Sequence, residues 1–355
     1  MSEEREPPLS LKSVDSSPMP PPSIASPTHS IKAEPQSVLS HLSDLTILHF
    51  NDVYEVEPRQ EDPVGGAARF VTAVKKFSSQ NPLIIFSGDC LNPSVLSKIT
   101  KGRHMISILN SIGVHFAVFG NHEFDFGVDL LQDVMQEMQC QWFLSNVFDT
   151  FTSQPLGHGL VQKILEWNKL KIGLMGLVEE DWLGTLGTVD KANLQYIDYV
   201  VIANQLAVDL RARGAEFVIA MTHMRWGNDF RLAQNCQGVD LVLGGHDHEY
   251  GVKKVRNTWI VKSGSDFRNL TEIRIKNNSG SLEYAFQKID IMQNLNEDEF
   301  VKAIVHESTL NLQILESKTE LTSYSVSGGE FPCINLLCFI QGVYDRVDLP
   351  LIRQL

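Results

Sequence analysis

Polar side chains that can bind metal ions follow five separate apolar runs of the 355-residue sequence. The runs and the residues after them are LTILHF with Asn51, Asp52 and Tyr54, PLIIFS with Gly88 and Asp89, HFAVF with Asn121, His122, Glu123 and Asp125, FVIAMT with His223, and VDLVLG with His246, Asp247 and His248. One such cluster is typical of a polar loop. Five clusters after five buried strands indicate one shared site, because α/β folds gather their sites at the carboxyl ends of strands.

The residue types in these clusters favour a centre that holds two metal ions. Carboxylates together with imidazoles suit Zn, Mn or Fe rather than Ca. Two divalent ions about 3.5–4 Å apart repel each other, and a carboxylate shared between them offsets part of that repulsion. Glycines 88, 120, 244 and 245 fit sharp turns in which the backbone passes close to the ligands.

The elements that must position these side chains alternate between strands and helices. Apolar runs of four to eight residues recur from Leu45 onward, bounded by Gly, Asn or Asp, and are typical of strands buried on both faces. Helical patterns lie between several of them, and they are AARFVTAVKKF, HMISILNSI, GVDLLQDVMQEM and YVVIANQLAVDLRARG. The sequence therefore predicts an α/β fold in which helices cover a layered sheet core.

Composition argues against some classes of binding partner and sets expectations for the cysteines and for membrane association. The net charge of −13 argues against a general nucleic-acid or anionic-membrane binder, because phosphate contact needs a basic face. Five scattered cysteines without a CxxC pair predict reduced thiols rather than a disulfide framework or structural zinc. The sequence contains neither an apolar signal-peptide region nor a run of about 18 apolar residues, so we expect no membrane span and a cytoplasmic protein.

The ordered set NDxY, GD, GNHE, TH and GHDH resembles the calcineurin-like metallophosphoesterases, and HFND, GNHEFDFG and THM resemble their 5′-nucleotidase branch. The resemblance covers roughly residues 45–290. It implies a four-layer αββα sandwich of two packed mixed sheets flanked by helices. It also implies a metal-dependent phosphomonoester hydrolase with two divalent ions, whose identities (Zn, Mn, Fe or Co) the sequence leaves open.

The resemblance also implies a role for each matching residue. Asp89 would bridge both ions, Asp52 and His248 would hold the first ion, and Asn121, His223 and His246 would hold the second. His122, oriented by Asp125, would face the phosphate and assist the leaving group while a metal-activated hydroxide attacks phosphorus. Glu123 and Asp247 would orient the ligands. The residues that bind the rest of the substrate stay unknown.

Two features depart from the family pattern. Tyr54 stands where most members have a second histidine ligand of the first ion. Either the phenolate binds a ferric ion, or water completes the coordination and the first ion binds weakly. His49 lies inside the strand, so we interpret it as a satisfied core histidine and not as a substitute ligand.

The second departure concerns domains. Residues 1–43 are rich in Ser and Pro and predict a disordered tail. The resemblance implies a metallophosphoesterase domain over residues 44–294. Residues 295–318 predict a linker helix, and residues 319–355 an atypical tail that replaces the family's second, nucleotide-binding domain.

The predicted substrate is therefore a small phosphorylated molecule, either a nucleoside monophosphate or a sugar phosphate. Two alternatives stay open. One is a phosphodiesterase acting on cyclic nucleotides, because the same kind of centre serves both bond types. The other is a non-catalytic or weakly active scaffold, which Tyr54 and the absent second domain would favour. The sequence does not predict the oligomeric state.

Overall fold

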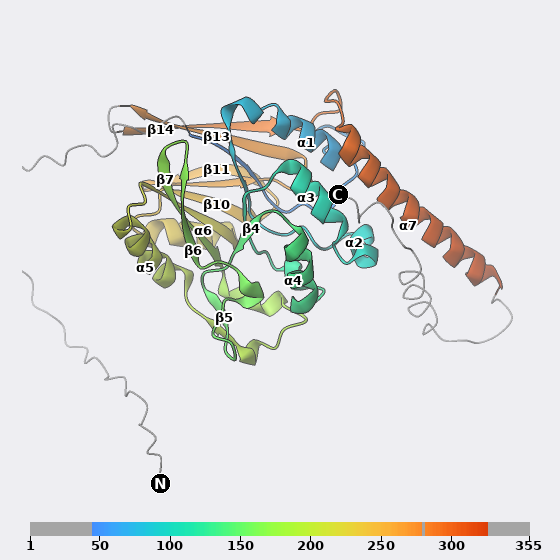
Figure 1. The fold of residues 1–355 in the computed structure, drawn as a ribbon, viewed down its shortest axis with the longest axis horizontal. Helices are drawn as coiled ribbons and strands as arrows, with labels where there is room; N and C mark the ends of the chain where they lie inside the picture. Colours follow the sequence, from blue (N-terminus) through green and yellow to red (C-terminus); the bar gives the residue numbers. More distant parts are fainter. Residues whose placement is uncertain (1–44, 279–280, 326–355) are drawn as a thin grey trace, which may run out of the picture. The chain divides into compact units, whose positions relative to one another are not determined.

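The computed structural model describes residues 45–278 and 281–325 (Figure 1). The predicted tail over 1–43 and the segment 326–355 lie outside the described residues. Three cysteines, Cys90, Cys140 and Cys236, are buried and free, in agreement with the prediction of reduced thiols for these positions.

Two six-stranded mixed sheets form the centre of the fold. The first sheet has the order β14-β13-β1-β2-β3-β4 and the second has the order β11-β12-β10-β9-β7-β6. The strands of the first are β1 (Leu45–Phe50), β2 (Leu83–Phe86), β3 (Phe116–Val118), β4 (Gln141–Phe143), β13 (Asn269–Asn278) and β14 (Ser281–Asp290). Those of the second are β6 (Gln162–Trp167), β7 (Leu170–Val178), β9 (Phe217–Met224), β10 (Leu241–His246), β11 (Tyr250–Val255) and β12 (Thr258–Ser263). A small third sheet pairs β5 (Val147–Asp149) with β8 (Leu194–Tyr196).

Each sheet contains a run of four strands paired in parallel, and its other strands pair antiparallel. β1 to β4 are paired in parallel in the first sheet, and β7, β9, β10 and β12 in the second. The outer strands β13, β14, β6 and β11 pair antiparallel to their neighbours. Parallel strands carry their carboxyl ends to the same edge, which is where the predicted ligands follow.

Successive side chains of the central strands face two different apolar layers, as the two-residue period of a strand requires. Ile47 packs between the sheets with Leu243. Leu48 faces the opposite way, into the layer that contains Phe70 of α1. In the second sheet Val242 packs against the layer of α5. The order of layers is helix, sheet, sheet, helix, which confirms the predicted four-layer αββα class.

Helices cover the outer faces of both sheets. Figure 1 shows α1, α3 and α4 lying together, away from α5. The helices are α1 (Ala67–Lys75), α2 (Val95–Thr100), α3 (His104–Ile112), α4 (Val128–Glu137), α5 (Tyr199–Ala212), α6 (Trp226–Asn235) and α7 (Glu299–Ser325). Short 3₁₀ helices are η2 (Ser78–Gln80), η3 (His122–Phe124), η4 (Leu156–His158), η5 (Glu180–Thr185) and η6 (Lys191–Asn193). Within the described ranges, none of the helices has the length and apolar content needed to cross a bilayer.

The bounds of the predicted linker helix over 295–318 were wrong. α7 begins at Glu299, because Asp298 precedes it and its carboxylate accepts a hydrogen bond from Val301 N at 3.2 Å. The helix continues to Ser325, past the predicted end. Its first turns are tied to α1, since Lys75 Nζ lies 2.5 Å from Asp298 Oδ2.

Candidate metal centre

The carboxyl ends of five strands from both sheets converge on one site. β1 leads into Asp52, β2 into Asp89, β3 into Asn121, and β9 and β10 end at or next to His223 and His246. The backbone turns sharply at the first two positions, where Asp52 has φ 52° and Asp89 has φ 66°. Non-glycine residues rarely adopt such angles, and they occur where the surrounding structure fixes a functional geometry.

Asp89 is the carboxylate that lies between Tyr54 and His223. Its Oδ2 lies 3.1 Å from His223 Nε2 and 3.0 Å from the Tyr54 hydroxyl, and its Oδ1 accepts a hydrogen bond from His122 N at 2.9 Å. Gly120 makes room for it, because a Cβ there would lie 2.1 Å from Asp89 Oδ1. Asp89 therefore lies between Tyr54 and His223, and its bridging role stays a prediction.

We define the second half of the site as Asn121, His223 and His246. Ligand atoms of Asp89, His223 and His246 all lie within 4.8 Å of one another. His223 is fully buried, and its Nδ1 is fixed at 2.7 Å from Ser87 O, which directs Nε2 to Asp89. Asn121 Oδ1 is buried and has no hydrogen-bond partner among the described residues.

We define the first half as Asp52, Tyr54 and His248. The Tyr54 hydroxyl lies 3.0 Å from Asp52 Oδ1 and 3.2 Å from His248 Nε2. His248 Nε2 in turn lies 3.4 Å from Asp52 Oδ1. The other Asp52 oxygen, Oδ2, accepts hydrogen bonds from Asn51 Nδ2 at 2.7 Å and from His246 N at 2.9 Å. Tyr54 is therefore a member of the cluster, and Asp52 links the two halves.

His122 and Asp125 form the expected pair beside the cluster. His122 Nδ1 lies 2.7 Å from Asp125 Oδ2, at the two ends of the short helix η3. Asn92, which sequence analysis missed, donates from Nδ2 to the same Asp125 oxygen at 2.6 Å and accepts at Oδ1 from Ser97 Oγ at 2.7 Å. Burial disfavours the imidazolium, but the hydrogen bond to Asp125 and the charge of Asp89 outweigh it and raise the pKa of His122.

Glu123 and Asp247 lie behind the predicted ligands. Glu123 is fully buried and accepts hydrogen bonds from three backbone N–H groups, those of Asp89 at 2.9 Å, Cys90 at 2.7 Å and Gly120 at 2.6 Å. It thereby links the loops that carry Asp89 and Asn121. Asp247 accepts from Trp226 N at 2.6 Å and from the buried Lys262 Nζ at 2.8 Å.

Glu179 is a further residue that sequence analysis missed. Its buried carboxylate lies 3.9 Å from His246 Nε2 and 2.6 Å from Arg225 Nη1, and it accepts from Arg225 N at 2.8 Å. Glu179 follows the apolar run of β7, which is the same kind of signal that identified the other clusters. The Arg225 side chain is half exposed, so a cation lies at the rim of the second half.

Mutual attraction of buried charges dominates the electrostatics of the centre. Burial alone would lower the pKa of His223 and raise that of Asp89. Their attraction outweighs burial, raises the pKa of His223 to about 10 and holds that of Asp89 at about 2. The nearby Asp52 carboxylate raises the pKa of His248, whereas burial and the neighbouring His223 lower that of His246. The cluster thus favours positive charge, and metal ions would compete with protons for it.

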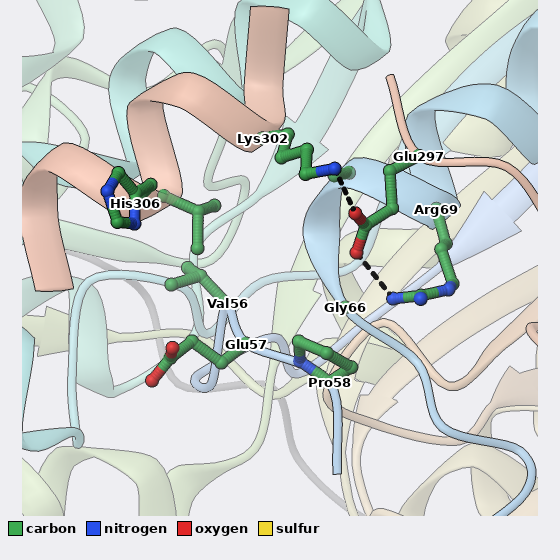
Figure 2. Close-up of a pocket in the computed structure, with 10 residues that line it drawn as sticks. Val56, Glu57, Pro58, Gly66, Arg69, Glu297, Lys302 and His306 are labelled. Carbon is green, nitrogen blue, oxygen red and sulfur yellow. Dashed lines mark hydrogen bonds and ion pairs between the residues drawn. The ribbon is translucent and has the colours of Figure 1, made fainter. Parts of the chain in front are cut away.

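His49 and Arg69 lie outside the centre. His49 is fully buried, with Nδ1 2.8 Å from Ser263 Oγ and Nε2 2.9 Å from Ser87 Oγ, as expected for a satisfied core histidine. Arg69 lines a pocket between α1 and α7, where its Nη1 binds Glu297 at 2.7 Å (Figure 2). Lys302 binds the other oxygen of Glu297 at 3.1 Å, and the residues that line this pocket include none of the predicted ligands.

Two observations support the binding of metal ions by these side chains. One buried oxygen of the second half, Asn121 Oδ1, lacks a hydrogen-bond partner within the described ranges, although buried polar groups are nearly always paired. In the first half the Tyr54 hydroxyl lies 3.0 Å from the carboxylates of Asp52 and Asp89 and 3.2 Å from the His248 imidazole. Oxygen and imidazole donors in such a set suit Zn, Mn or Fe.

Comparisons with known proteins agree with this geometry. The sequence profile of the calcineurin-like phosphoesterases matches residues 45–250. The chain is 30% identical over 223 residues to a snake venom 5′-nucleotidase of Naja atra, which covers 58% of this chain and 41% of that protein. It is 28% identical over 224 residues to the 5′-nucleotidase of Homo sapiens, covering 58% of this chain and 38% of that protein. The chain thus spans about two fifths of the length of these curated relatives.

Solved structures share the fold. The 5′-nucleotidase precursor from Thermus thermophilus matches with a TM-score of 0.70 at 21% identity, over 77% of this chain and 60% of that one. The calcineurin-like phosphoesterase YfkN from Bacillus subtilis matches with a TM-score of 0.62 at 20% identity, over 76% of this chain and 97% of that one.

Proposed function

Because the chain belongs to the calcineurin-like phosphoesterase family, we propose that it is a metal-dependent phosphomonoester hydrolase acting on a nucleoside monophosphate. The family match confirms the resemblance that the motifs indicated. The observation that carries the proposal is the convergence of both halves on Asp89, with the His122–Asp125 pair beside them. The names of the curated relatives, which are 5′-nucleotidases, support the substrate class.

Asp89, Asn121, His223 and His246 would hold one ion, and Asp52, Asp89 and His248 the other. When bound, such ions lower the pKa of water and neutralise phosphoryl oxygens. The protein orients its donors in advance: Ser87 O fixes His223. This organisation reduces the reorganisation needed when charge develops on the substrate.

His122 would donate the proton that the leaving alkoxide needs. Its Nδ1 is bound to Asp125, which leaves Nε2 as the nitrogen available to substrate. Asp125 also favours the protonated ring, since it raises the pKa of His122. The His122 side chain is 30% exposed, so it is accessible from solvent beside the buried donors.

We propose that Tyr54 supplies a further donor to the first ion. Ligands held about 2.1 Å from one ion are separated by roughly 3.0 Å at right angles and roughly 3.4 Å at tetrahedral angles. The Tyr54 oxygen lies 3.0 Å from Asp52 Oδ1, 3.0 Å from Asp89 Oδ2 and 3.2 Å from His248 Nε2, within that range. The phenol has a single proton, which it can donate to only one of the two carboxylates. The other carboxylate then faces a lone pair of the phenol oxygen.

Hydrolysis of an aryl phosphate by the purified chain with Mn²⁺, Co²⁺ or Zn²⁺ tests the proposal. We expect turnover of the monoester, and His122→Ala should lower kcat by about 10²–10⁴-fold without loss of metal. His306→Ala, at an exposed position of α7, is the matched control. Absence of turnover with all three ions would favour a scaffold, and faster turnover of a bis-aryl phosphate would favour a phosphodiesterase.

Metal content tests the part assigned to Tyr54. Tyr54→Phe removes the oxygen and keeps the ring, so we expect the first position to lose metal in elemental analysis. Tyr54→His restores a donor and should restore occupancy. Full occupancy in Tyr54→Phe would show that the phenol is not a ligand.

A further inference from the structure

A fully buried lysine lies behind the metal centre. Lys262 belongs to β12, and its side chain has no exposed area. Burying an ammonium is costly unless it is paired and hydrogen-bonded, so such a residue must have strong local partners. Lys262 Nζ lies 2.8 Å from Asp247 Oδ2 and 3.1 Å from Asp229 Oδ2, and it donates to Met224 O at 2.5 Å and to Gly245 O at 2.8 Å.

Three of these partners are sequence neighbours of predicted ligands. Met224 directly follows His223, and Gly245 directly precedes His246. Asp247 lies between His246 and His248. One ammonium group therefore joins the end of β9 to the end of β10 and to the turn that carries His248. These two strands are parallel neighbours, and both end at this point of the sheet.

The surrounding residues are shaped for the lysine. A Cβ on Gly244 would lie 3.0 Å from Lys262 Cε, so glycine at this position leaves the space that the side chain fills. The Trp226 ring covers the ammonium, with Nζ 5.0 Å from its centroid. Trp226 N also donates to the Asp247 oxygen that binds Lys262. The first turn of α6 is thereby joined to the same group.

From this geometry we infer that Lys262 is a positioning residue that sets the metal affinity of the second half. It acts through the backbone on either side of His223 and His246 and does not contact the predicted donor atoms. The inference rests on the metal centre of the proposed function, but it concerns binding and needs no turnover.

Lys262→Met in the full chain tests the inference, with Zn²⁺ binding measured by competition with a chromophoric chelator. We define the second-half step as the Zn²⁺-binding step that is lost in His223→Ala. We expect Lys262→Met to weaken that step by about 10–100-fold, as changes to groups that orient ligands commonly do. The other step should change by less than about threefold.

A second variant separates positioning from stability. Lys262→Met leaves the Asp229 carboxylate buried without its cation, and Lys262→Met/Asp229→Asn removes that charge. Asp229 contacts Thr222 Oγ1 at 2.7 Å and Lys262, neither of which is a predicted ligand. Asn at 229 should therefore restore stability, measured by urea unfolding, without restoring Zn²⁺ affinity.

Recovery of both stability and affinity in the double variant would overturn the inference, because the lysine would then act only by keeping the chain folded. An unchanged second-half step in a folded Lys262→Met protein would overturn it as well. A wild-type chain that binds Zn²⁺ but does not hydrolyse the aryl phosphate would refute the hydrolase proposal alone.

Discussion

The two halves of the metal centre differ in how firmly the protein holds them. In the second half the His223 side chain is fully buried and fixed by Ser87 O, on a strand paired on both sides. In the first half the His248 side chain is 53% exposed and follows the end of β10. The first half instead contains an additional oxygen, that of Tyr54.

This difference indicates separate roles for rigidity and charge. A buried, pre-oriented imidazole loses little freedom when it binds an ion, so the second half is built for tight binding. The first half has one carboxylate, Asp52, and the Tyr54 phenol, whose pKa is raised by burial and by the charges of Asp89 and Asp52, around an exposed histidine. It is therefore the half whose occupancy should depend more on the kind and concentration of metal. Five substitutions test the comparison.

Removing one histidine from each half should give the largest and most unequal losses. We expect His223→Ala to lower kcat/KM on the order of 10³-fold, about 4 kcal/mol, because an ion contributes several kcal/mol to charge stabilisation. His248→Ala should cost about tenfold, since Asp52, Tyr54 and Asp89 remain. Steady-state rates with elemental analysis measure both, and equal losses would break the comparison.

Gly120→Ala should affect both halves together. A Cβ at this position would lie 2.1 Å from Asp89 Oδ1 and must displace the shared carboxylate. We expect a fall in rate of about 10²-fold with loss of metal from both positions, because small misplacements of reacting groups have effects of that size. Gly227→Ala in α6, where the added Cβ meets nothing within 4 Å, is the control and should keep wild-type metal content. Selective loss from one position would show that Asp89 is not shared.

Asn92→Ala should leave both halves loaded and change only the proton donor. Its amide donates to Asp125 Oδ2 at 2.6 Å, so its loss loosens the group that orients His122. We expect kcat to fall about tenfold, in line with a lost hydrogen bond to a charged group, with a changed pH profile. Asn204→Ala, whose side chain bonds backbone groups of α5 and α6, is a comparison outside the site. A change in metal content in Asn92→Ala would contradict this expectation.

Asp198→Ala should have the smallest effect and spare the centre. Asp198 caps α5 by accepting from Val200 N at 2.9 Å and also binds Arg231 at 2.8 Å. We expect a loss of about 1 kcal/mol of stability at pH 7. Burial opposes the shift, but the hydrogen bonds from Arg231 and from the helix N-terminus lower the pKa of Asp198.

The lowered pKa fixes the sign of the pH dependence of this effect. The carboxylate stabilises the folded state fully above its unfolded pKa of about 3.9, and the stabilisation is lost as pH falls through the lower folded value. The stability gap between wild type and Asp198→Ala should thus be constant above about pH 5 and narrow below about pH 4. Urea unfolding at several pH values measures it, and a gap that widens in acid would contradict the assignment.

Residues next to apolar runs could be predicted from sequence, and supporting residues could not. Asp52, Asp89 and His223 each lie at or just after the end of a buried strand, so the rule that α/β sites gather at strand ends predicted that they share one edge of the fold. Their roles as ligands stay predictions. Asn92 lies 33 positions before Asp125 in a loop with no such pattern, and only the folded chain shows their contact. Lys262 did leave a signal, because a charge inside the apolar run TWIVKSG needs buried partners.

The outer strands were also missed for a physical reason. β6, β11 and β14 are partly exposed strands at the sheet edges, so their sequences lack the continuous apolar runs that identified the central strands. QKILEW in β6 mixes charged and apolar residues, and its side chains are mostly half-buried. The apolar runs therefore identified the central strands, which position the site, more completely than the edge strands.

Glu123 has a consequence for how the chain acquires its ions. Because one carboxylate holds amides of two neighbouring loops, the loops stay joined whether or not any cation is present. Uptake and release of metal can then take place as exchange on a finished scaffold, without the protein melting. In deuterium oxide, the amide protons of Asp89, Cys90 and Gly120 would rank among the slowest to exchange, in chelator-treated and metal-loaded protein alike.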